Sequence, residues 1–458
     1  MHGFARLPLT MSVPPPRSPT AVRWIALICL APILAAAAAV WRQDFGGALP
    51  LGLFNEGRAV YEGLAAIMLA GLLGAAAALA FEGIRGRTLG LAGAVRGALA
   101  AFLVTELLVT ALDVGLVSRD RGAGLGGPYR EAQSVAGTRV FLKRPHPGSP
   151  LGFRTATPYA KVPAGRRVLF LGDSYTEGSG RSPECNYPEV ALAVARDRLG
   201  PAWEGMNAGV AGYGPADSLA LLRFLEEEGY EFDAVVWSLF LENDFTDDLP
   251  GTERRVVAGI NFRFPQSPFL RWVHPLNSRT FRYALFVARA AQLRGASDDA
   301  VRRGDGECRP PGPLADPLPE ELEALVRRRL EASYREPLAP LATGVVAESL
   351  EAFTAETRRL GVPLVWVVFP DRVLADTELQ ARLGWDGDPA GYDLDRLTRW
   401  VRERAGDVPL VELVEPLRGP ASNYRGSDTH LSDEGNVVAG RHVGERLADH
   451  FGVSPTSD

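Results

Sequence analysis

The strongest constraint on the fold is an alternation of short apolar runs with helical segments, which begins at Arg166 and continues almost to the C-terminus. The expected strands are residues 167–171, 205–209, 234–240, 364–369 and 410–413. The expected helices are residues 187–199, 217–228, 345–360, 394–405 and 433–451. Strands that alternate with helices indicate βαβ units, whose parallel sheet is covered by helices on both faces. The pattern therefore predicts an α/β domain with a five-stranded parallel sheet over residues 166–458, with an insert at 246–344.

Chemically distinctive residues follow the ends of these strands. Ser174 follows the first strand in GDSYTEG, glycines follow the second in NAGVAGYGP, and Asn243 follows the third. Asp428 and His430 precede the last helix in GSDTHLSDEGN. A serine there is commonly a helix N-cap, and an Asn–Asp pair after a strand is commonly a turn. Because ligands of parallel sheets bind at the carboxyl ends of the strands, we expect the four segments to meet, as acyl transfer requires.

The four segments, in this order, resemble the four motif blocks of the SGNH (GDSL-type) hydrolases over residues 166–451, apart from the insert. The resemblance implies a flavodoxin-like three-layer fold. It also implies that Ser174 is the nucleophile and that the oxyanion hole consists of the N–H groups of Ser174 and Gly212 with the side chain of Asn243. Gly209 is the alternative donor from the glycine segment. No cofactor and no metal ion are implied.

The resemblance further implies that His430 takes the proton from the serine while Asp428 orients the imidazole. Many members of the family carry the acid three residues before the histidine, where this chain has Ser427. The Asp-Thr-His arrangement is similar to SGNH domains of exopolysaccharide O-acetylation systems. A Ser–His dyad that is assisted by a backbone carbonyl is the alternative.

The N-terminal part predicts a membrane anchor. Residues 24–41, 63–81 and 97–117 are apolar runs of about the ~20 residues that a spanning helix needs. Arginines before the first run and between the second and third predict a cytoplasmic tail at 1–23 and an extracytoplasmic catalytic domain. The first run could instead be a cleaved signal peptide. Residues 118–165, rich in Gly, Pro and Arg, are expected to form a linker into the domain.

Composition and residue spacing argue against several classes of binding partner. The net charge is −6 with no basic block, which argues against nucleic acid. Metal-ligand spacings and phosphate-binding loops are absent from the sequence. Cys185 and Cys308 would both lie outside the membrane, where disulfides persist, and whether they pair is open.

These observations predict a multi-pass, extracytoplasmic serine esterase, periplasmic or exterior, that works through an acyl-serine intermediate. The expected substrate is an O-acyl group on a cell-envelope glycan or a lipid ester. One alternative is an O-acyltransferase that moves an acyl group to an envelope glycan, which would need a separate acyl-donor membrane protein. The other is a non-catalytic envelope protein that binds glycan.

Overall fold

The computed structural model describes residues 129–143, 145, 148–178, 183–241, 244, 252–257, 260–265, 323, 326–327, 330, 334, 340–384, 391–419, 423–425 and 429–451. The chain divides into two compact units, and all of these residues belong to the second, Gly115–Arg271 with Phe281–Asp458. The predicted spans, residues 24–41, 63–81 and 97–117, lie outside the described residues. Within the described part of the chain, no helix combines the length and apolar character needed to cross a bilayer.

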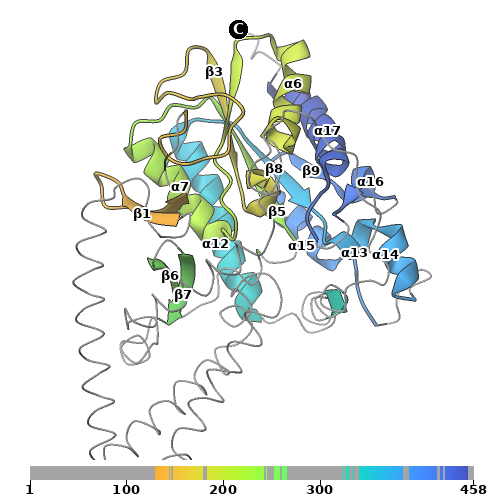
Figure 1. The fold of residues 1–458 in the computed structure, drawn as a ribbon. Helices are drawn as coiled ribbons and strands as arrows, with labels where there is room; N and C mark the ends of the chain where they lie inside the picture. Colours follow the sequence, from red (N-terminus) through yellow and green to blue (C-terminus); the bar gives the residue numbers. More distant parts are fainter. Residues whose placement is uncertain are drawn as a thin grey trace, which may run out of the picture. The chain divides into compact units, whose positions relative to one another are not determined.

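A five-stranded parallel sheet forms the centre of this unit (Figure 1). Its strands are β3 (Arg166–Leu171), β4 (Trp203–Asn207), β5 (Ala234–Phe240), β8 (Leu364–Phe369) and β9 (Leu410–Glu412). They lie in the order β4-β3-β5-β8-β9, and every neighbouring pair is parallel. Counted along the chain this is the order 2-1-3-4-5 of flavodoxin-like doubly wound sheets. The predicted five-stranded parallel sheet is confirmed.

Helices cover both faces of the sheet. Because side chains alternate along a strand, Leu169 and Leu171 of β3 face one apolar cluster while Val168 and Phe170 face another. The first cluster contains residues of α7 (Pro215–Glu227), α12 (Pro340–Leu360) and α15 (Arg396–Ala405). The second contains residues of α6 (Tyr187–Leu199) and α17 (Asp433–Phe451). The domain therefore has three layers.

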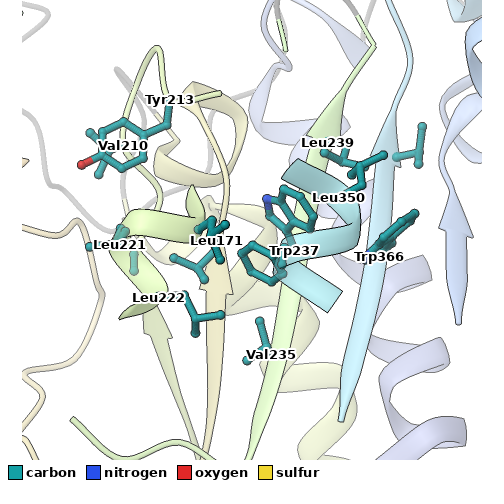
Figure 2. Close-up of a cluster of buried hydrophobic side chains, with 14 of the residues drawn as sticks. Leu171, Val210, Tyr213, Leu221, Leu222, Val235, Trp237, Leu239, Leu350 and Trp366 are labelled. Carbon is teal, nitrogen blue, oxygen red and sulfur yellow. The ribbon is translucent and has the colours of Figure 1, made fainter. Parts of the chain in front are cut away.

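Aromatic rings fill the centre of the first cluster. The ring of Trp237 stacks on Phe353 with centroids 3.9 Å apart and meets Trp366 edge-on at 6.0 Å. Figure 2 shows Trp237 among aliphatic side chains of the neighbouring strands and helices, including Leu171 and Leu350. Such aromatic pairs add about 0.5–1.5 kcal/mol beyond their burial. This packing supports β3 and β5, whose carboxyl ends lead into the site described below.

Two glycines let α17 lie close against α6. A Cβ at Gly444 would stand 2.5 Å from the carbonyl oxygen of Ala191, and a Cβ at Gly440 would stand 2.5 Å from the Cβ of Val190. Real Cβ atoms do not approach neighbours this closely. The last helix can therefore pack on its neighbour at backbone distance, which places the loop before it at the end of the sheet.

Several boundaries differ from the sequence-based expectation. Strand β4 ends at Asn207, two residues before the predicted end, because the Asn207 side chain accepts a hydrogen bond from the Gly209 N–H at 3.0 Å and turns the chain. The structure also has short helices that the periodicity did not predict. They are η1 (Pro183–Cys185), α13 (Arg372–Ala375), α14 (Thr377–Arg382) and α16 (Val414–Leu417). Runs this short show no usable periodicity.

A β-hairpin occupies part of the segment that was expected to be a linker. Strands β1 (Tyr129–Gln133) and β2 (Arg139–Lys143) pair antiparallel. Val140 and Leu142 of β2 are buried in the first apolar cluster, so the hairpin packs on the domain. A second hairpin, β6 (Thr252–Val257) and β7 (Ile260–Pro265), lies within the predicted insert and contacts the first one. Both hairpins are additions to the sheet domain that strand–helix alternation does not predict.

Candidate active site

The site lies at the carboxyl ends of β3 and β5, where the order of the sheet reverses. Strand β3 connects onward to β4 on one side, while β5 lies on its other side. Connections that leave in opposite directions open a crevice at this switch point, and ligands of doubly wound sheets bind there. Because β3 ends at Leu171, Ser174 stands just beyond the strand at the switch point.

A tight turn carries Ser174 from the strand into the short helix α5 (Ser174–Glu177). Gly172 has a φ of 153°, and a Cβ there would lie 2.3 Å from Thr176 Oγ1, so the turn requires glycine. Asp173 is buried and caps the helix, since its Oδ1 accepts the Tyr175 N–H at 2.9 Å. Ser174 is half-buried, and no described residue accepts a hydrogen bond from its backbone N–H. That N–H can therefore donate to a bound ester.

His430 meets Ser174 across 256 residues of sequence. The Nε2 atom of His430 lies 2.9 Å from the Oγ of Ser174, which is hydrogen-bonding distance for a base and the proton it removes. The Tyr175 ring stacks on the imidazole with centroids 5.4 Å apart, and the Tyr175 hydroxyl donates to the carbonyl oxygen of Thr429 at 2.5 Å. Tyr175, the residue after Ser174, thus holds the segment that carries His430. The predicted Ser174–His430 pair is brought together.

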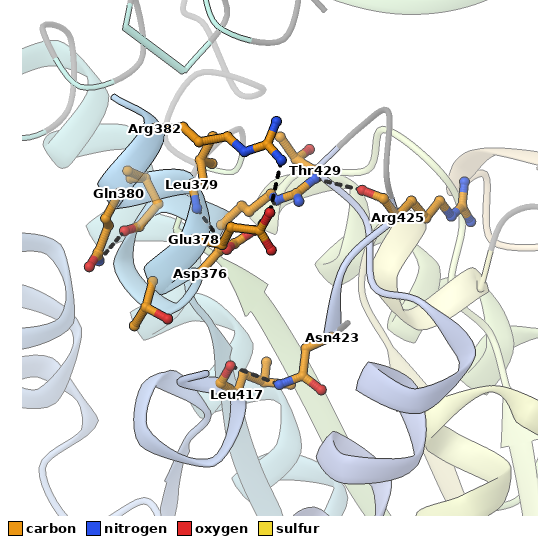
Figure 3. Close-up of polar contacts among 12 residues, drawn as sticks. Asp376, Glu378, Leu379, Gln380, Arg382, Leu417, Asn423, Arg425 and Thr429 are labelled. Carbon is orange, nitrogen blue, oxygen red and sulfur yellow. Dashed lines mark hydrogen bonds and ion pairs between the residues drawn. The ribbon is translucent and has the colours of Figure 1, made fainter. Parts of the chain in front are cut away.

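The buried Arg372 supports the backbone at His430 through Arg425. The Arg425 N–H donates to the His430 carbonyl oxygen at 2.9 Å. Its own carbonyl oxygen accepts from Arg372 Nη1 at 2.6 Å, and Arg372 Nε donates to Asp376 Oδ2 at 2.8 Å. Figure 3 labels Arg425 and Asp376, the two residues that Arg372 joins. Arg372 and Asp376 are both fully buried. The residue pattern does not indicate this pair, because its connection to His430 exists only in the folded chain.

The glycine loop after β4 is fastened to α5. The side chain of Asn207 donates to the Thr176 carbonyl oxygen at 2.7 Å and accepts the Gly209 N–H at 3.0 Å. Gly209, the alternative oxyanion donor, therefore already uses its N–H. Gly212 has a φ of 76°, is half-buried, and its N–H donates to no described residue. Of the two glycines, Gly212 is therefore the one whose N–H donates to no described residue.

Two hydrogen bonds join the loop that carries Gly212 to residues on either side of Ser174. The Val210 N–H donates to the Gly172 carbonyl oxygen at 3.0 Å, and the Ala211 N–H donates to Glu177 Oε2 at 2.7 Å. Gly172 precedes Ser174 and Glu177 ends its helix. The loop is therefore bonded at both ends of the nucleophile segment, and Gly212 is the next residue along it.

Two predicted site residues, Asn243 and Asp428, lie outside the described residues. Their roles as oxyanion donor and as orienter of the imidazole stay predictions. Asp244 is described: it is buried, and its Oδ2 accepts the Phe240 N–H at 2.8 Å. This hydrogen bond ties Asp244 to the carboxyl end of β5, the strand that Asn243 was predicted to follow.

A buried ion pair beside the site was missed by the sequence analysis. The Glu177 side chain is 1% exposed and contacts the Lys143 ammonium of the β1–β2 hairpin. Burial, with the Arg154 guanidinium as the second cause, lowers the pKa of Lys143 to about 8. Burial also lowers the pKa of Arg154, with Arg425 as the second cause. The only indication of this ion pair in the sequence was the acidic residue Glu177 within the GDSYTEG segment.

Cys185 is fully buried and disulfide-bonded. The other two cysteines, Cys29 and Cys308, lie outside the described residues, so whether Cys185 pairs with Cys308 stays open. The next residue, Asn186, caps α6 and donates through Nδ2 to the Thr176 carbonyl oxygen at 2.8 Å. The disulfide-bonded residue is therefore next in the chain to one that hydrogen-bonds to α5.

The arrangement could support acyl transfer by a serine, because the Ser174 hydroxyl lies within hydrogen-bonding distance of an imidazole and the N–H groups of Ser174 and Gly212 donate to no described residue. No protein-family model and no curated protein matches the chain. Among solved structures, the chain is similar to a carbohydrate acetylesterase family member from Sinorhizobium meliloti at 14% identity, covering 63% of this chain and all of that one, with a TM-score of 0.32.

Two further solved structures show similarity of the same degree. One is a lipase/acylhydrolase from Enterococcus faecalis, at 13% identity, 62% and 96% coverage of this chain and that one, and a TM-score of 0.31. The other is a lipase from a goat rumen metagenome, at 11% identity, 62% and 97% coverage, and a TM-score of 0.32. Because these TM-scores and identities are low, the assignment of function rests on the geometry of the site.

Proposed function

We propose that this chain is a serine ester hydrolase of the SGNH type. The observation that carries the proposal is the 2.9 Å contact between Ser174 Oγ and His430 Nε2 at the switch point of the sheet. The serine and the histidine come from segments whose order and surroundings resemble the family's first and last motif blocks. A helix-capping serine would not need a histidine that is 256 residues away at hydrogen-bonding distance.

The reaction follows from the roles of these groups. Ser174 Oγ attacks the ester carbonyl carbon while His430 Nε2 accepts the hydroxyl proton. The resulting oxyanion accepts hydrogen bonds from the N–H groups of Ser174 and Gly212, and from Asn243 in the predicted assignment. Collapse of this intermediate breaks the ester bond, and His430 gives its proton to the leaving alcohol. Water then attacks the acyl-serine by the same route, which releases the acid and restores Ser174.

The orientation of the imidazole has two candidate sources. In the first, the Asp428 carboxylate accepts a hydrogen bond from the Nδ1–H of His430. In the second, a backbone carbonyl takes this place and the catalytic group is a Ser–His dyad. Asp428→Asn separates them, because loss of a triad aspartate lowers kcat by about 10⁴-fold. A loss of less than about tenfold favours the dyad.

We further propose that the domain faces the cell exterior or the periplasm and is anchored by the predicted spans at residues 24–41, 63–81 and 97–117. The disulfide at Cys185 supports this location, because disulfides persist in oxidising compartments. An enzyme held at the outer face of a membrane meets acylated envelope glycans and lipid esters. These are the proposed substrates.

The test is turnover of short and medium p-nitrophenyl esters by the full-length chain in detergent, beside Ser174→Ala. Steady turnover that falls by about 10⁴-fold or more in the variant supports the proposal. Absence of turnover, or turnover that is indifferent to Ser174, contradicts it. Addition of a glycan acceptor, followed by mass spectrometry, separates hydrolysis from transfer: acylated glycan in excess of free acid would favour the O-acyltransferase alternative.

A further inference from the structure

Glu177 connects three parts of the site through one carboxylate. It ends helix α5, one helical turn after Ser174, and its side chain is 1% exposed. Its Oε2 accepts the Ala211 N–H at 2.7 Å, and its Oε1 contacts the Lys143 ammonium. The nucleophile helix, the glycine loop and the β1–β2 hairpin therefore meet at this side chain.

The hairpin also holds the other side of Gly212. The Tyr213 hydroxyl accepts the Phe141 N–H at 3.1 Å and donates to the Phe141 carbonyl oxygen at 2.5 Å. Ala211 and Tyr213, the two neighbours of Gly212, are thus both fixed, one to Glu177 and one to β2. The contacts form a closed ring from Glu177 through Gly212 and β2 back to Glu177.

This closed set of contacts leaves the glycine loop little room to shift. A Cβ at Gly209 would stand 2.3 Å from the Glu177 backbone nitrogen, so the loop lies against α5 at backbone distance. A buried carboxylate is costly unless it is paired and hydrogen-bonded, and Glu177 has both an ammonium and a backbone donor as partners. Charge pairing and close packing together favour a single position of the loop.

We infer that Glu177 is a positioning residue for the oxyanion hole, and that the β1–β2 hairpin completes the active site by neutralising Glu177 through Lys143 and by holding Tyr213 through Phe141. The inference rests on the proposed function, because it takes Ser174 as nucleophile and the Gly212 N–H as oxyanion donor. The carboxylate fixes the distance between those two groups, and it does not itself touch the ester.

The test compares four full-length variants in detergent. Glu177→Leu removes both the acceptor for Ala211 and the partner of Lys143, while Glu177→Gln keeps an acceptor oxygen without the charge. Tyr213→Phe removes the bonds to Phe141. Glu228→Gln is the matched control: it removes a carboxylate at the C-terminal end of α7 that pairs with the exposed Lys161 at 3.4 Å.

The expected result is a fall in kcat with little change in KM. Loss of one oxyanion donor lowers kcat by about 10²–10³-fold, so Glu177→Leu should approach about 10²-fold. Glu177→Gln and Tyr213→Phe should each lie between that variant and wild type, and the control should match wild type. Rates are expressed per active site, titrated to completion with a serine-directed phosphonate, so that misfolded molecules are not counted.

The outcomes separate the two proposals. In one outcome, wild-type turnover depends on Ser174 while Glu177→Leu has an unchanged kcat per titrated site. This outcome overturns the positioning role and leaves the esterase proposal intact. A reduced active fraction with unchanged kcat per site shows that Glu177 only supports folding, which also overturns it. If wild type neither turns over esters nor reacts with the phosphonate, both proposals fail.

Discussion

The ring of Tyr175 stacks on the imidazole of His430, with centroids 5.4 Å apart and planes inclined by 28°. The same ring contacts Phe240 and Phe369, the last residues of β5 and β8, at centroid distances of 4.2 and 5.1 Å. Tyr175, which follows Ser174, thus forms an apolar surface against which the His430 imidazole packs. The orientation of the base therefore depends on packing at the ends of the central strands.

Tyr175→Phe tests this support. The substitution keeps the ring and removes the hydroxyl that donates to the Thr429 carbonyl oxygen at 2.5 Å. A buried acceptor that loses its donor costs about 1–3 kcal/mol of unfolding free energy. We expect that loss in denaturant unfolding, together with a fall in kcat of about tenfold as the segment before His430 loosens. A variant that is destabilised with unchanged kcat would show that Thr429 does not help to place the base.

The two glycines of the β4 loop should respond differently to alanine. In Gly209→Ala, the new Cβ would stand 2.3 Å from the Glu177 nitrogen and 2.6 Å from the Thr176 carbonyl carbon. Such overpacking typically costs about 1–3 kcal/mol, so this variant should lose thermal stability.

In Gly212→Ala, the left-handed φ of 76° adds strain of about 1–2 kcal/mol and turns the N–H donor. For Gly212→Ala we expect a larger loss of kcat, and a smaller loss of thermal stability, than for Gly209→Ala. Equal effects of the two substitutions on kcat per folded molecule would contradict the choice of Gly212 as donor.

Arg372 should contribute far more to the free energy of unfolding than a surface arginine does. Arg372→Met leaves the fully buried Asp376 without its partner, and breaking a buried pair in this way costs about 3–5 kcal/mol. The control is Arg418→Met, whose pair with Glu415 is exposed and should be worth about 0–1 kcal/mol. Chemical denaturation of both variants measures the difference. Similar losses in the two would mean that the buried pair contributes no more than an exposed one.

The Lys143–Glu177 pair predicts a fall in activity at alkaline pH. Burial, followed by the nearby Arg154, lowers the pKa of Lys143 to about 8. Below that pH the ammonium carries its charge and neutralises Glu177; above it the charge is lost and the buried carboxylate has no cationic partner. We therefore expect kcat to decline as pH rises through about 8 to 9. In Lys143→Arg the decline should move to higher pH, because a guanidinium stays protonated. A decline at the same pH in that variant would show that another group causes it.

Much of the domain was predictable from local pattern. The ends of β5 and β8 and the spans of α6 and α17 agree with the periodicity, because buried strands and amphipathic helices leave their repeat in the residues themselves. Strand–helix alternation likewise predicted a parallel sheet, and a parallel sheet predicted that Ser174 would lie at its carboxyl edge. The distance of 2.9 Å to His430 agrees with that expectation.

What the sequence by itself determined is therefore the five strands of the sheet, the long helices that cover it and the place of Ser174 at its carboxyl edge. Only the tertiary structure decided which groups surround that serine. The contact of Lys143 with Glu177, the bonds of Tyr213 to Phe141 and the support of Arg425 by Arg372 join residues far apart in the chain. Such contacts have no period and no local propensity. They arise because burial forces each polar group to find a partner within reach, and that partner is known only once the chain has folded.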